Sequence, residues 1–252
     1  MSRLLPETVT IGLLPGQCWL RRGARDTEYA GSAGPQALLH SLEFMLDKQT
    51  RPLDKRARVQ VQVSDSLAAI TVLPWQEQLS AADELRAYAH ACFEQQGVRL
   101  DEGWAMQTGY RRFRAGGLAY ALPQAWLAQL MSVLEARGLR LQSVLPVSAA
   151  AYWRGQGGRL PGQELWLLQE AQRLTALVYE GGSLLAIDVQ PVTEDGIAAA
   201  GGRLLRRVVA RHRAIARLRH WPVAQLHADA PEFVADCLPE AVVSPLLRHA
   251  WS

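Results

Sequence analysis

The stretch from Glu164 to Gln190 constrains the fold most, because it predicts three consecutive strands. Its first apolar run, Leu165–Leu168, is followed by a polar loop and a second run, Leu174–Tyr179. The turn Glu180-Gly181-Gly182-Ser183 then leads into Leu184–Val189. A Gly-Gly turn between two β-rich runs is typical of a hairpin, because glycine adopts the positive φ angles that tight hairpin turns require. We therefore expect a strand, a loop, a strand, a tight turn and a third strand.

The first half of the chain predicts a similar order of elements. Apolar runs on either side of Pro15-Gly16 indicate an N-terminal hairpin, and leucines at helical spacing indicate a helix further on. The predicted elements are the strands Thr8–Leu14 and Cys18–Leu20, the loop Asp26–Gly34, the helix Gln36–Lys48, and the strands Arg58–Val63 and Ala68–Leu73. Three strands followed by a helix, a strand and a helix, occurring twice, are the architecture of a duplicated RNase H-like fold.

A smaller α/β unit is expected at about residues 75–122. Its helix is predicted from Ser80 to about Gln96, where Gly97 is placed to end it. Trp104–Tyr110 and Gly117–Leu122 are predicted as paired strands, and the basic turn Arg111-Arg112-Phe113-Arg114 separates them. We expect this unit to be an insertion in the first lobe.

The clearest boundary between lobes is the loop Gly155–Gly162, which contains four glycines and a proline. It predicts a first lobe over residues 1–154, with the insertion, and a second, shortened lobe over residues 163–252. In the second lobe, Asp195 is placed to cap a helix from Gly196 to about His220, and Val223–His227 is predicted as the last strand.

Composition excludes several classes of protein. The 252 residues are 49% hydrophobic, but no apolar run approaches the roughly 20 residues that a membrane span requires. The start of the chain has no signal-peptide pattern, which predicts a cytoplasmic location. Three isolated cysteines argue against a disulfide framework or a metal site. The net charge of +3 is too small to indicate nucleic acid.

The order of elements resembles the PilM and GspL type of actin-like protein, as do the segments VQVSDSLAAITVLPW and LQSVLPVSAAAYWR. Those proteins are cytoplasmic platform components of type IV pilus and type II secretion machines. The resemblance implies an α/β, actin-like (ASKHA) fold of two RNase H-like lobes, with a small α/β insertion in the first lobe. It also implies a location at the inner face of the inner membrane.

The resemblance further implies where nucleotide-binding residues belong. In the second phosphate hairpin of the superfamily, an Asp, a Gly two places on and a Thr four beyond that hold magnesium and phosphates. When Thr175 is matched to that Thr, Gln169 falls at the Asp and Ala171 at the Gly. The first hairpin, from Thr8 to Arg25, contains no Asp or Glu, and Asp229 falls where the adenosine loop has glycine. We therefore expect a pseudo-ATPase that binds no cofactor or metal.

A binding role follows from that loss. The resemblance implies a scaffold that holds the cytoplasmic segment of an inner-membrane PilN-like or GspM-like component, with an assembly ATPase or a second copy of the chain as further partners. Trp and Arg supply most interface hot spots, which makes the candidate partner-binding residues Trp75, Trp104, Arg203, Arg206 and Arg207. Two alternatives stay open: an ATPase or sugar-kinase-like enzyme with non-standard acids, and a regulatory module unrelated to pili. Ser64-Asp65-Ser66 is interpreted as a turn and not as a nucleophile.

Overall fold

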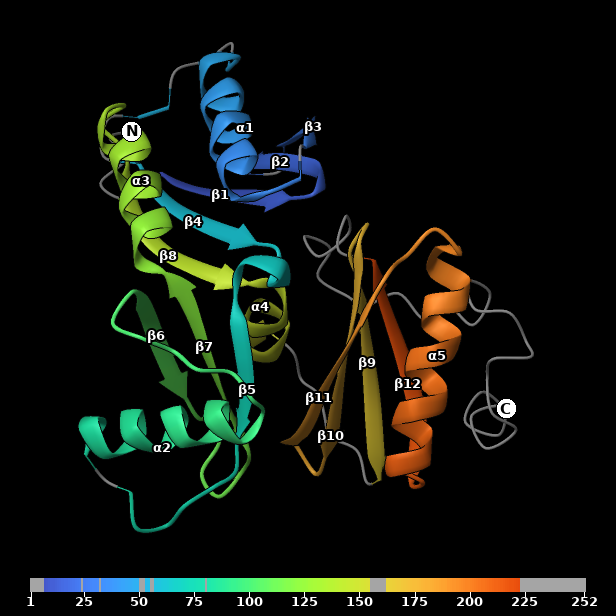
Figure 1. Cartoon of the computed structure of the whole chain (residues 1–252). Coiled ribbons are helices and arrows are strands. Elements are labelled where there is room, and N and C mark those ends of the chain that lie inside the picture. The colour runs from blue at the N-terminus through green and yellow to red at the C-terminus, as the bar shows by residue number, and fades with distance from the viewer. Residues whose placement is uncertain are drawn as a thin grey trace. The chain divides into compact units, whose positions relative to one another are not determined.

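The computed structural model describes residues 7–23, 25–31, 33–49, 53–54, 57–79, 81–154 and 162–222. Within these ranges the chain forms three β-sheets and five α-helices (Figure 1). The described residues divide into two compact units. The first consists of the described residues up to Ala69, Asp101–Ala105 and Ala121–Ala150. The second consists of Ile70–Leu100, Met106–Tyr120 and the described residues from Ala151 onward.

The first unit contains a five-stranded sheet in the order β3-β2-β1-β4-β8. Its strands are β1 (Thr8–Leu14), β2 (Gly16–Arg22), β3 (Arg25–Gly31), β4 (Arg58–Val63) and β8 (Arg140–Pro146). The central β1 pairs antiparallel with β2 and parallel with β4. The helices α1 (Pro35–Asp47) and α3 (Gln124–Glu135) pack against each other, and Trp126 Nε1 donates a hydrogen bond of 2.9 Å to Pro35 O.

The predicted loop Asp26–Gly34 is wrong for most of its length, because β3 pairs antiparallel with β2 from Arg25 to Gly31. Thr27, Glu28 and Ala30 are exposed on this strand. An edge strand bonds to a neighbour on one side only and tolerates polar residues, so hydrophobic alternation does not reveal it.

The end of β4 is hydrogen-bonded to the first turn of a later helix. The chain leaves β4 through a 3₁₀ turn, Asp65–Leu67, and Ser64 Oγ accepts a hydrogen bond from Ser66 N. Asp65 is fully buried and accepts hydrogen bonds from both the backbone N–H and the hydroxyl of Ser148, in the first turn of α4 (Val147–Arg154). The prediction of a turn at Ser64-Asp65-Ser66 is confirmed, and the carboxylate caps a helix.

The second unit contains a four-stranded sheet in the order β11-β10-β9-β12. Its strands are β9 (Gln163–Gln169), β10 (Arg173–Glu180), β11 (Ser183–Pro191) and β12 (Ile215–Pro222). The helix α5 (Gly196–Arg211) supplies Leu204, Leu205 and Val208 to a fully buried core against Leu165 and other strand residues. Both units thus have the same order of elements: three antiparallel strands, a helix, and a strand that pairs in parallel with the first strand. This order confirms the predicted duplication.

The predicted helix from Gly196 to His220 is too long. It ends at Arg211, and Ile215–Pro222 forms β12, which pairs in parallel with β9. A shift in pairing register between Ile215 and Arg217 disturbs the alternation that identifies a strand. The buried apolar residues Ile215, Leu218 and Trp221 recur every third position, which resembles helical spacing. The strand predicted at Val223–His227 lies outside the described residues.

The third sheet has the order β5-β7-β6 and is formed by β5 (Ala69–Leu73), β6 (Trp104–Gly109) and β7 (Gly117–Pro123). The helix α2 (Ala82–Gln95) belongs to the same α/β unit. This unit begins a few residues before the predicted start, because β5 joins its sheet. Most of it falls in the compact unit of the four-stranded sheet, whereas the sequence places it in the first lobe. Nearly all of the predicted boundary loop Gly155–Gly162 lies outside the described residues.

Candidate functional site

The loop between β9 and β10 stands where the second phosphate hairpin is expected. Gln169 is the last residue of β9, and its Oε1 lies 2.6 Å from His220 Nε2 of β12. An amide oxygen only accepts hydrogen bonds, so His220 Nε2 is the donor in this contact. His220 is 2% exposed. The side chain at the predicted Asp position is therefore uncharged and already bonded inside the sheet.

In the rest of this loop, Glu170 is buried, whereas Ala171 and Gln172 are exposed. Glu170 N donates to Arg173 O at 2.8 Å, which makes the turn tight. Thr175 and Glu170 are both buried. Trp221, next to His220, stacks edge-on against Trp166 of β9 at 5.6 Å between ring centroids. Ala171 lies in the turn itself. Among the described residues, no group of His, Cys, Asp and Glu is arranged to hold a metal ion.

The first hairpin carries an aromatic ring in place of a carboxylate. Gly12 of β1 and Trp19 of β2 are directly paired, and Trp19 is 2% exposed. A Cβ atom added at Gly12 would come within 2.1 Å of Trp19 Nε1. The indole therefore lies flat against the backbone of β1, and only glycine leaves room for it. Asp229, the third predicted position, lies outside the described residues.

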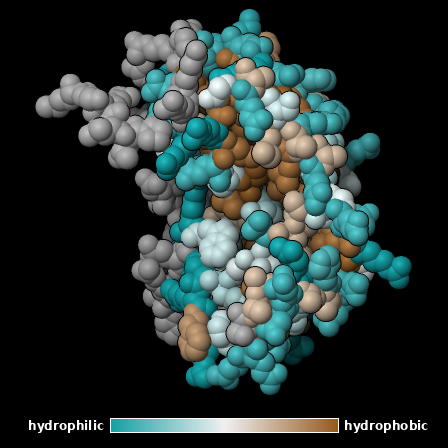
Figure 2. All heavy atoms as spheres, turned by 90° about the vertical axis from the view of Figure 1, so that its left-hand side faces the viewer, coloured by the Kyte–Doolittle hydropathy of each residue, from teal (hydrophilic) through white to brown (hydrophobic). Residues whose placement is uncertain are grey.

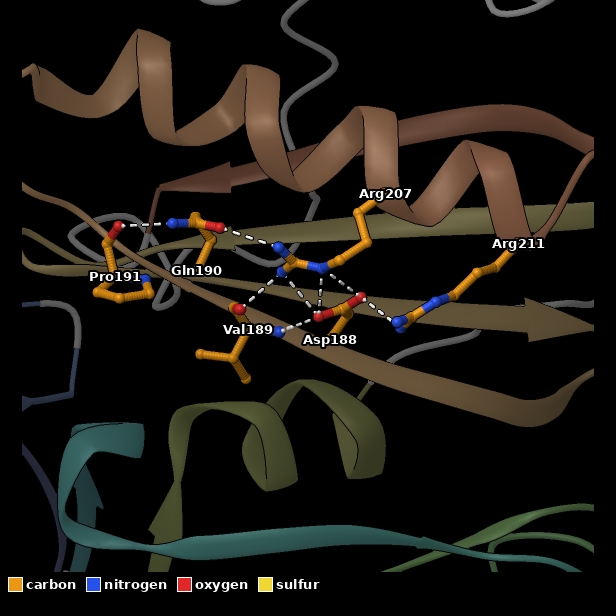
Figure 3. Close-up of polar contacts among 6 residues, drawn as sticks. All are labelled: Asp188, Val189, Gln190, Pro191, Arg207 and Arg211. Atoms are coloured by element: carbon orange, nitrogen blue, oxygen red, sulfur yellow. Dashed lines mark hydrogen bonds and ion pairs between the residues drawn. The ribbon is translucent and has the colours of Figure 1, made fainter. Parts of the chain in front are cut away.

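Two arginines of α5, Arg207 and Arg211, contact Asp188 of the strand β11. Arg207 forms a bidentate ion pair with Asp188 of β11, with Nε 3.0 Å from Oδ2 and Nη2 2.8 Å from Oδ1 (Figure 3). The same guanidinium donates to Gln190 Oε1 and Val189 O, and Arg211 contacts Asp188 from the next turn of α5. Burial raises the pKa of Asp188, but the hydrogen bonds and charge of Arg207 outweigh it and hold the pKa below its usual value.

This cluster also covers the edge of the sheet. The strand β11 lies at one end of the sheet order, where backbone groups on its outer side have no neighbouring strand. At Val189, the N–H donates to Asp188 Oδ1 and the carbonyl accepts from Arg207. Side chains that hydrogen-bond to the backbone groups of an edge strand in this way hinder its pairing with a strand of another chain. The position of Arg207 is therefore explained within the unit, without a partner.

The other two predicted arginines differ from each other. Arg203 forms an ion pair with Asp195 and donates to Thr193. The hydrogen bond from Arg203 and, to a smaller extent, the one from Thr193 lower the pKa of Asp195 to about 2. Arg206 is exposed and forms no ion pair with any described residue. Of the three, Arg206 alone presents a guanidinium that the described chain leaves for other contacts.

Trp75 takes part in an aromatic cluster that sequence reasoning did not identify. Its ring lies edge-on to Tyr110 at 5.0 Å and to Phe113 at 5.1 Å between centroids. Phe113 is 75% exposed. The basic turn was recognised in the sequence, but its contact with Trp75 depends on the pairing of β5 with β7. Trp104 is half-buried and begins β6 at the end away from this turn, so it is not part of the cluster.

The first unit has an apolar hollow between α3 and the edge strand β8. Figure 2 shows apolar residues gathered around a depression on this face. Its volume is about 460 Å³, and Met131 at its rim is 45% exposed. The residues that line it are Met131, Glu135, Gly138, Leu139, Arg140 and Leu141.

Comparison with known proteins agrees with this architecture. No protein-family model matches the chain, and no curated protein does so either. A Bacteroides thetaiotaomicron protein of actin-like ATPase fold and unknown function has a TM-score of 0.60 at 10% identity, over 98% of this chain and 89% of that one. The cytoplasmic domain of EpsL, an inner-membrane component of the type II secretion system of Vibrio cholerae, gives 0.52 at 17% identity, over 97% and 94%. A chain of the PilM–PilN type IV pilus biogenesis complex gives 0.60 at 12% identity, over 89% and 84%.

These similarities establish the fold and no more, because all three identities are low. The chain has an actin-like α/β fold, as predicted. The solved structures of this fold that it resembles include proteins of type II secretion and type IV pilus systems. No helix among the described residues is long and apolar enough to cross a membrane.

Proposed function

We propose that this chain is a non-catalytic actin-like scaffold of a type IV pilus or type II secretion-like assembly platform. It works at the cytoplasmic face of the inner membrane, where it holds the cytoplasmic segment of a PilN-like or GspM-like membrane protein. The observation that carries the loss of catalysis is the hydrogen bond between the half-buried Gln169 and the buried His220.

Phosphoryl transfer depends on charge at this position. Carboxylates hold the magnesium ion that neutralises the phosphates, and the protein contributes little covalent chemistry of its own. Gln169 has no charge, and its oxygen is bonded to His220. The first hairpin places the Trp19 ring on Gly12 and supplies no carboxylate between Thr8 and Arg22. Both hairpins thus have their strands, but the first contains no Asp or Glu and the second has Gln169 at the assigned Asp position, with Glu170 one place away.

The platform role is supported by the kinds of protein that share the fold over nearly the whole chain. One is the cytoplasmic domain of an inner-membrane secretion component, and another comes from a complex of PilM with PilN. A scaffold needs a stable frame and a partner surface, and it does not need magnesium or ATP. The alternative of an enzyme with non-standard acids predicts nucleotide binding, which the next experiment measures.

Isothermal titration calorimetry with magnesium and ATP tests the proposal. We expect no measurable binding by the wild-type chain. The double variant Gln169→Asp with Ala171→Gly is a matched comparison. We expect it to show no measurable ATP binding either, because Trp19 still occupies the first hairpin. Binding of ATP by the wild type with Kd tighter than about 10 μM, roughly −7 kcal/mol, contradicts the loss of nucleotide function.

A second measurement addresses the scaffold role. The cytoplasmic segment of a PilN-like or GspM-like membrane protein from the same organism, made as a labelled peptide, is expected to bind the purified chain. A chain that binds neither nucleotide nor this segment contradicts the proposed role.

A further inference from the structure

We propose that the turn between β6 and β7, together with Trp75, is a docking surface for an acidic protein segment that carries an aromatic or large aliphatic anchor. We call this surface the aromatic-arginine turn, and it consists of Trp75, Glu77 and residues 110–116. The proposal rests on the proposed scaffold function and adds the chemistry of one partner. It does not depend on whether the chain binds ATP.

The surface presents a large apolar side chain to solvent. Phe113 is the most exposed large hydrophobic residue among those described, at 75%. It does not stand alone, because its ring contacts Trp75, which in turn contacts Tyr110. Tyr110 Oη donates to Pro74 O at 3.2 Å, and burial raises the pKa of Tyr110 to about 12. Tyr110 is thus a neutral aromatic in this cluster at physiological pH.

The turn is held in place before any partner binds. Arg111 N donates to Tyr152 Oη at 2.9 Å, and Arg111 Nη1 donates to Tyr152 O at 2.7 Å. At the other end, Gly116 N donates to Ser183 Oγ at 2.6 Å, in the strand β11 of the same unit. A surface whose backbone is already ordered loses less entropy on binding, so exposed rings on it contribute more to affinity.

The backbone of this turn is strained at one residue. Arg114 has φ of 57°, and it is the only described residue other than glycine with a positive φ. The left-handed conformation costs a residue with a side chain on the order of 1–3 kcal/mol and occurs mostly where function or packing demands it. In this conformation the Arg114 guanidinium lies 5.3 Å from the centroid of the Phe113 ring and pairs with Glu77. The strain therefore keeps a cation beside the exposed ring.

Charge identifies the partner as acidic. Three of the four residues from Arg111 to Arg114 are arginines, and Glu77 is the carboxylate paired with one of them. Arg112 forms no ion pair with the described chain, and its guanidinium lies over Gly182 in the turn after β10. Arg with Trp and Tyr is the combination that dominates interface hot spots. An acidic segment with one apolar anchor matches both the charge and the exposed ring.

A protein segment fits this surface better than a lipid headgroup. Glu77 is 69% exposed within the cluster, and its carboxylate would face the phosphates of an anionic membrane. A peptide can place carboxylates beside Arg112 and a single large side chain beside Phe113.

Fluorescence anisotropy with synthetic peptides tests the proposal. The probe is a fluorescein-labelled peptide rich in Asp and Glu with one central Trp. Two comparison peptides have that Trp replaced by Ser, or all acids replaced by Lys. We expect the acidic Trp peptide to bind the wild-type chain, and each comparison peptide to bind at least about tenfold more weakly.

Variants locate the site. Phe113→Ser and, separately, Arg112→Glu are expected to weaken binding of the acidic Trp peptide at least about tenfold. The control is Phe44→Ser in the first unit, because Phe44 is also exposed, at 53%, with Tyr29 edge-on and Lys48 over its ring. This control should leave binding unchanged. Circular dichroism checks that each variant stays folded.

Three outcomes overturn the proposal. The first is that no acidic peptide binds, and the second is that Phe113→Ser binds as well as wild type. The third is binding to vesicles rich in phosphatidylserine that Phe113→Ser abolishes, without any peptide binding, which would assign the surface to a membrane. Because none of these measurements involves ATP, their failure is distinguishable from failure of the nucleotide test.

Discussion

The ion cluster between α5 and β11 allows a quantitative test of the second unit. Arg207→Met removes the guanidinium but keeps an unbranched side chain of similar length. It eliminates the bidentate contact with Asp188 and the bonds to Gln190 Oε1 and Val189 O. Asp188→Asn removes the negative charge, while Arg207 keeps its bonds to Gln190 and Val189.

The expected loss of stability follows from the exposure of the two side chains and from the hydrogen bonds that they form. Hydrogen bonds to charged groups contribute about 1.5–3 kcal/mol, and exposed ion pairs contribute less than about 1 kcal/mol. The Asp188 side chain is 17% exposed and that of Arg207 is 34% exposed, so solvent screens this pair less than a fully exposed one and the range for charged hydrogen bonds applies. We expect Arg207→Met to lower the free energy of unfolding by about 2–3 kcal/mol and Asp188→Asn by about 1–1.5 kcal/mol.

The two effects should not add, because both variants remove the same contact. We expect the double variant to be about as unstable as Arg207→Met alone, which gives a coupling energy of about 1 kcal/mol or more. The assay is urea unfolding followed by tryptophan fluorescence, since Trp166 and Trp221 are buried in this sheet. Arg206→Met is the control, with an expected change within about 0.5 kcal/mol because the side chain is exposed. Additivity within about 0.3 kcal/mol would refute the assigned role of the pair.

Two further predictions concern pH and packing. The pKa of Asp188 is lower in the folded protein than its ordinary value of about 3.9, so its stabilisation is fully present above about pH 4 and is lost as pH falls through the folded pKa. Wild type and Asp188→Asn should therefore differ most in stability near neutral pH and converge as the pH falls through the folded pKa of Asp188 in urea titrations, and a difference that grows on acidification would contradict this. Gly116→Ala should destabilise the chain by about 2 kcal/mol or more, because the new Cβ would lie 2.1 Å from Leu184 O. Gly103→Ala, whose new Cβ would meet only the Asp101 side chain at 3.0 Å, should change stability by less than half as much in the same assay.

Part of the fold follows from local patterns in the sequence. The run of three strands from Glu164 onward was predictable because apolar runs and the Gly-Gly turn are short-range signals. The repeated order of elements then indicated two related halves. The absence of carboxylates from the first hairpin and the presence of Gln169 are also properties of the sequence alone, once the resemblance assigns the positions.

Other features depend on which strands become neighbours. The strand β12 was predicted as the end of a helix, because a register shift against β9 breaks its alternation. The strand β3 was predicted as a loop, because an exposed edge carries polar residues. Both segments are strands because hydrogen bonds to a neighbouring strand, far away in the sequence for β12, outweigh their local preferences.

The roles of individual side chains were decided in the same way. The sequence shows that Arg207 lies on a basic helix, and only the packing of α5 beside β11 reveals that Asp188 holds it. The sequence shows Gln169 at an altered position, and only the parallel pairing of β12 with β9 brings His220 to it. Residue types and their spacing determine what each segment is able to form. The ion pairs and aromatic contacts form only when the sheet brings residues that are distant in sequence within a few ångströms of each other.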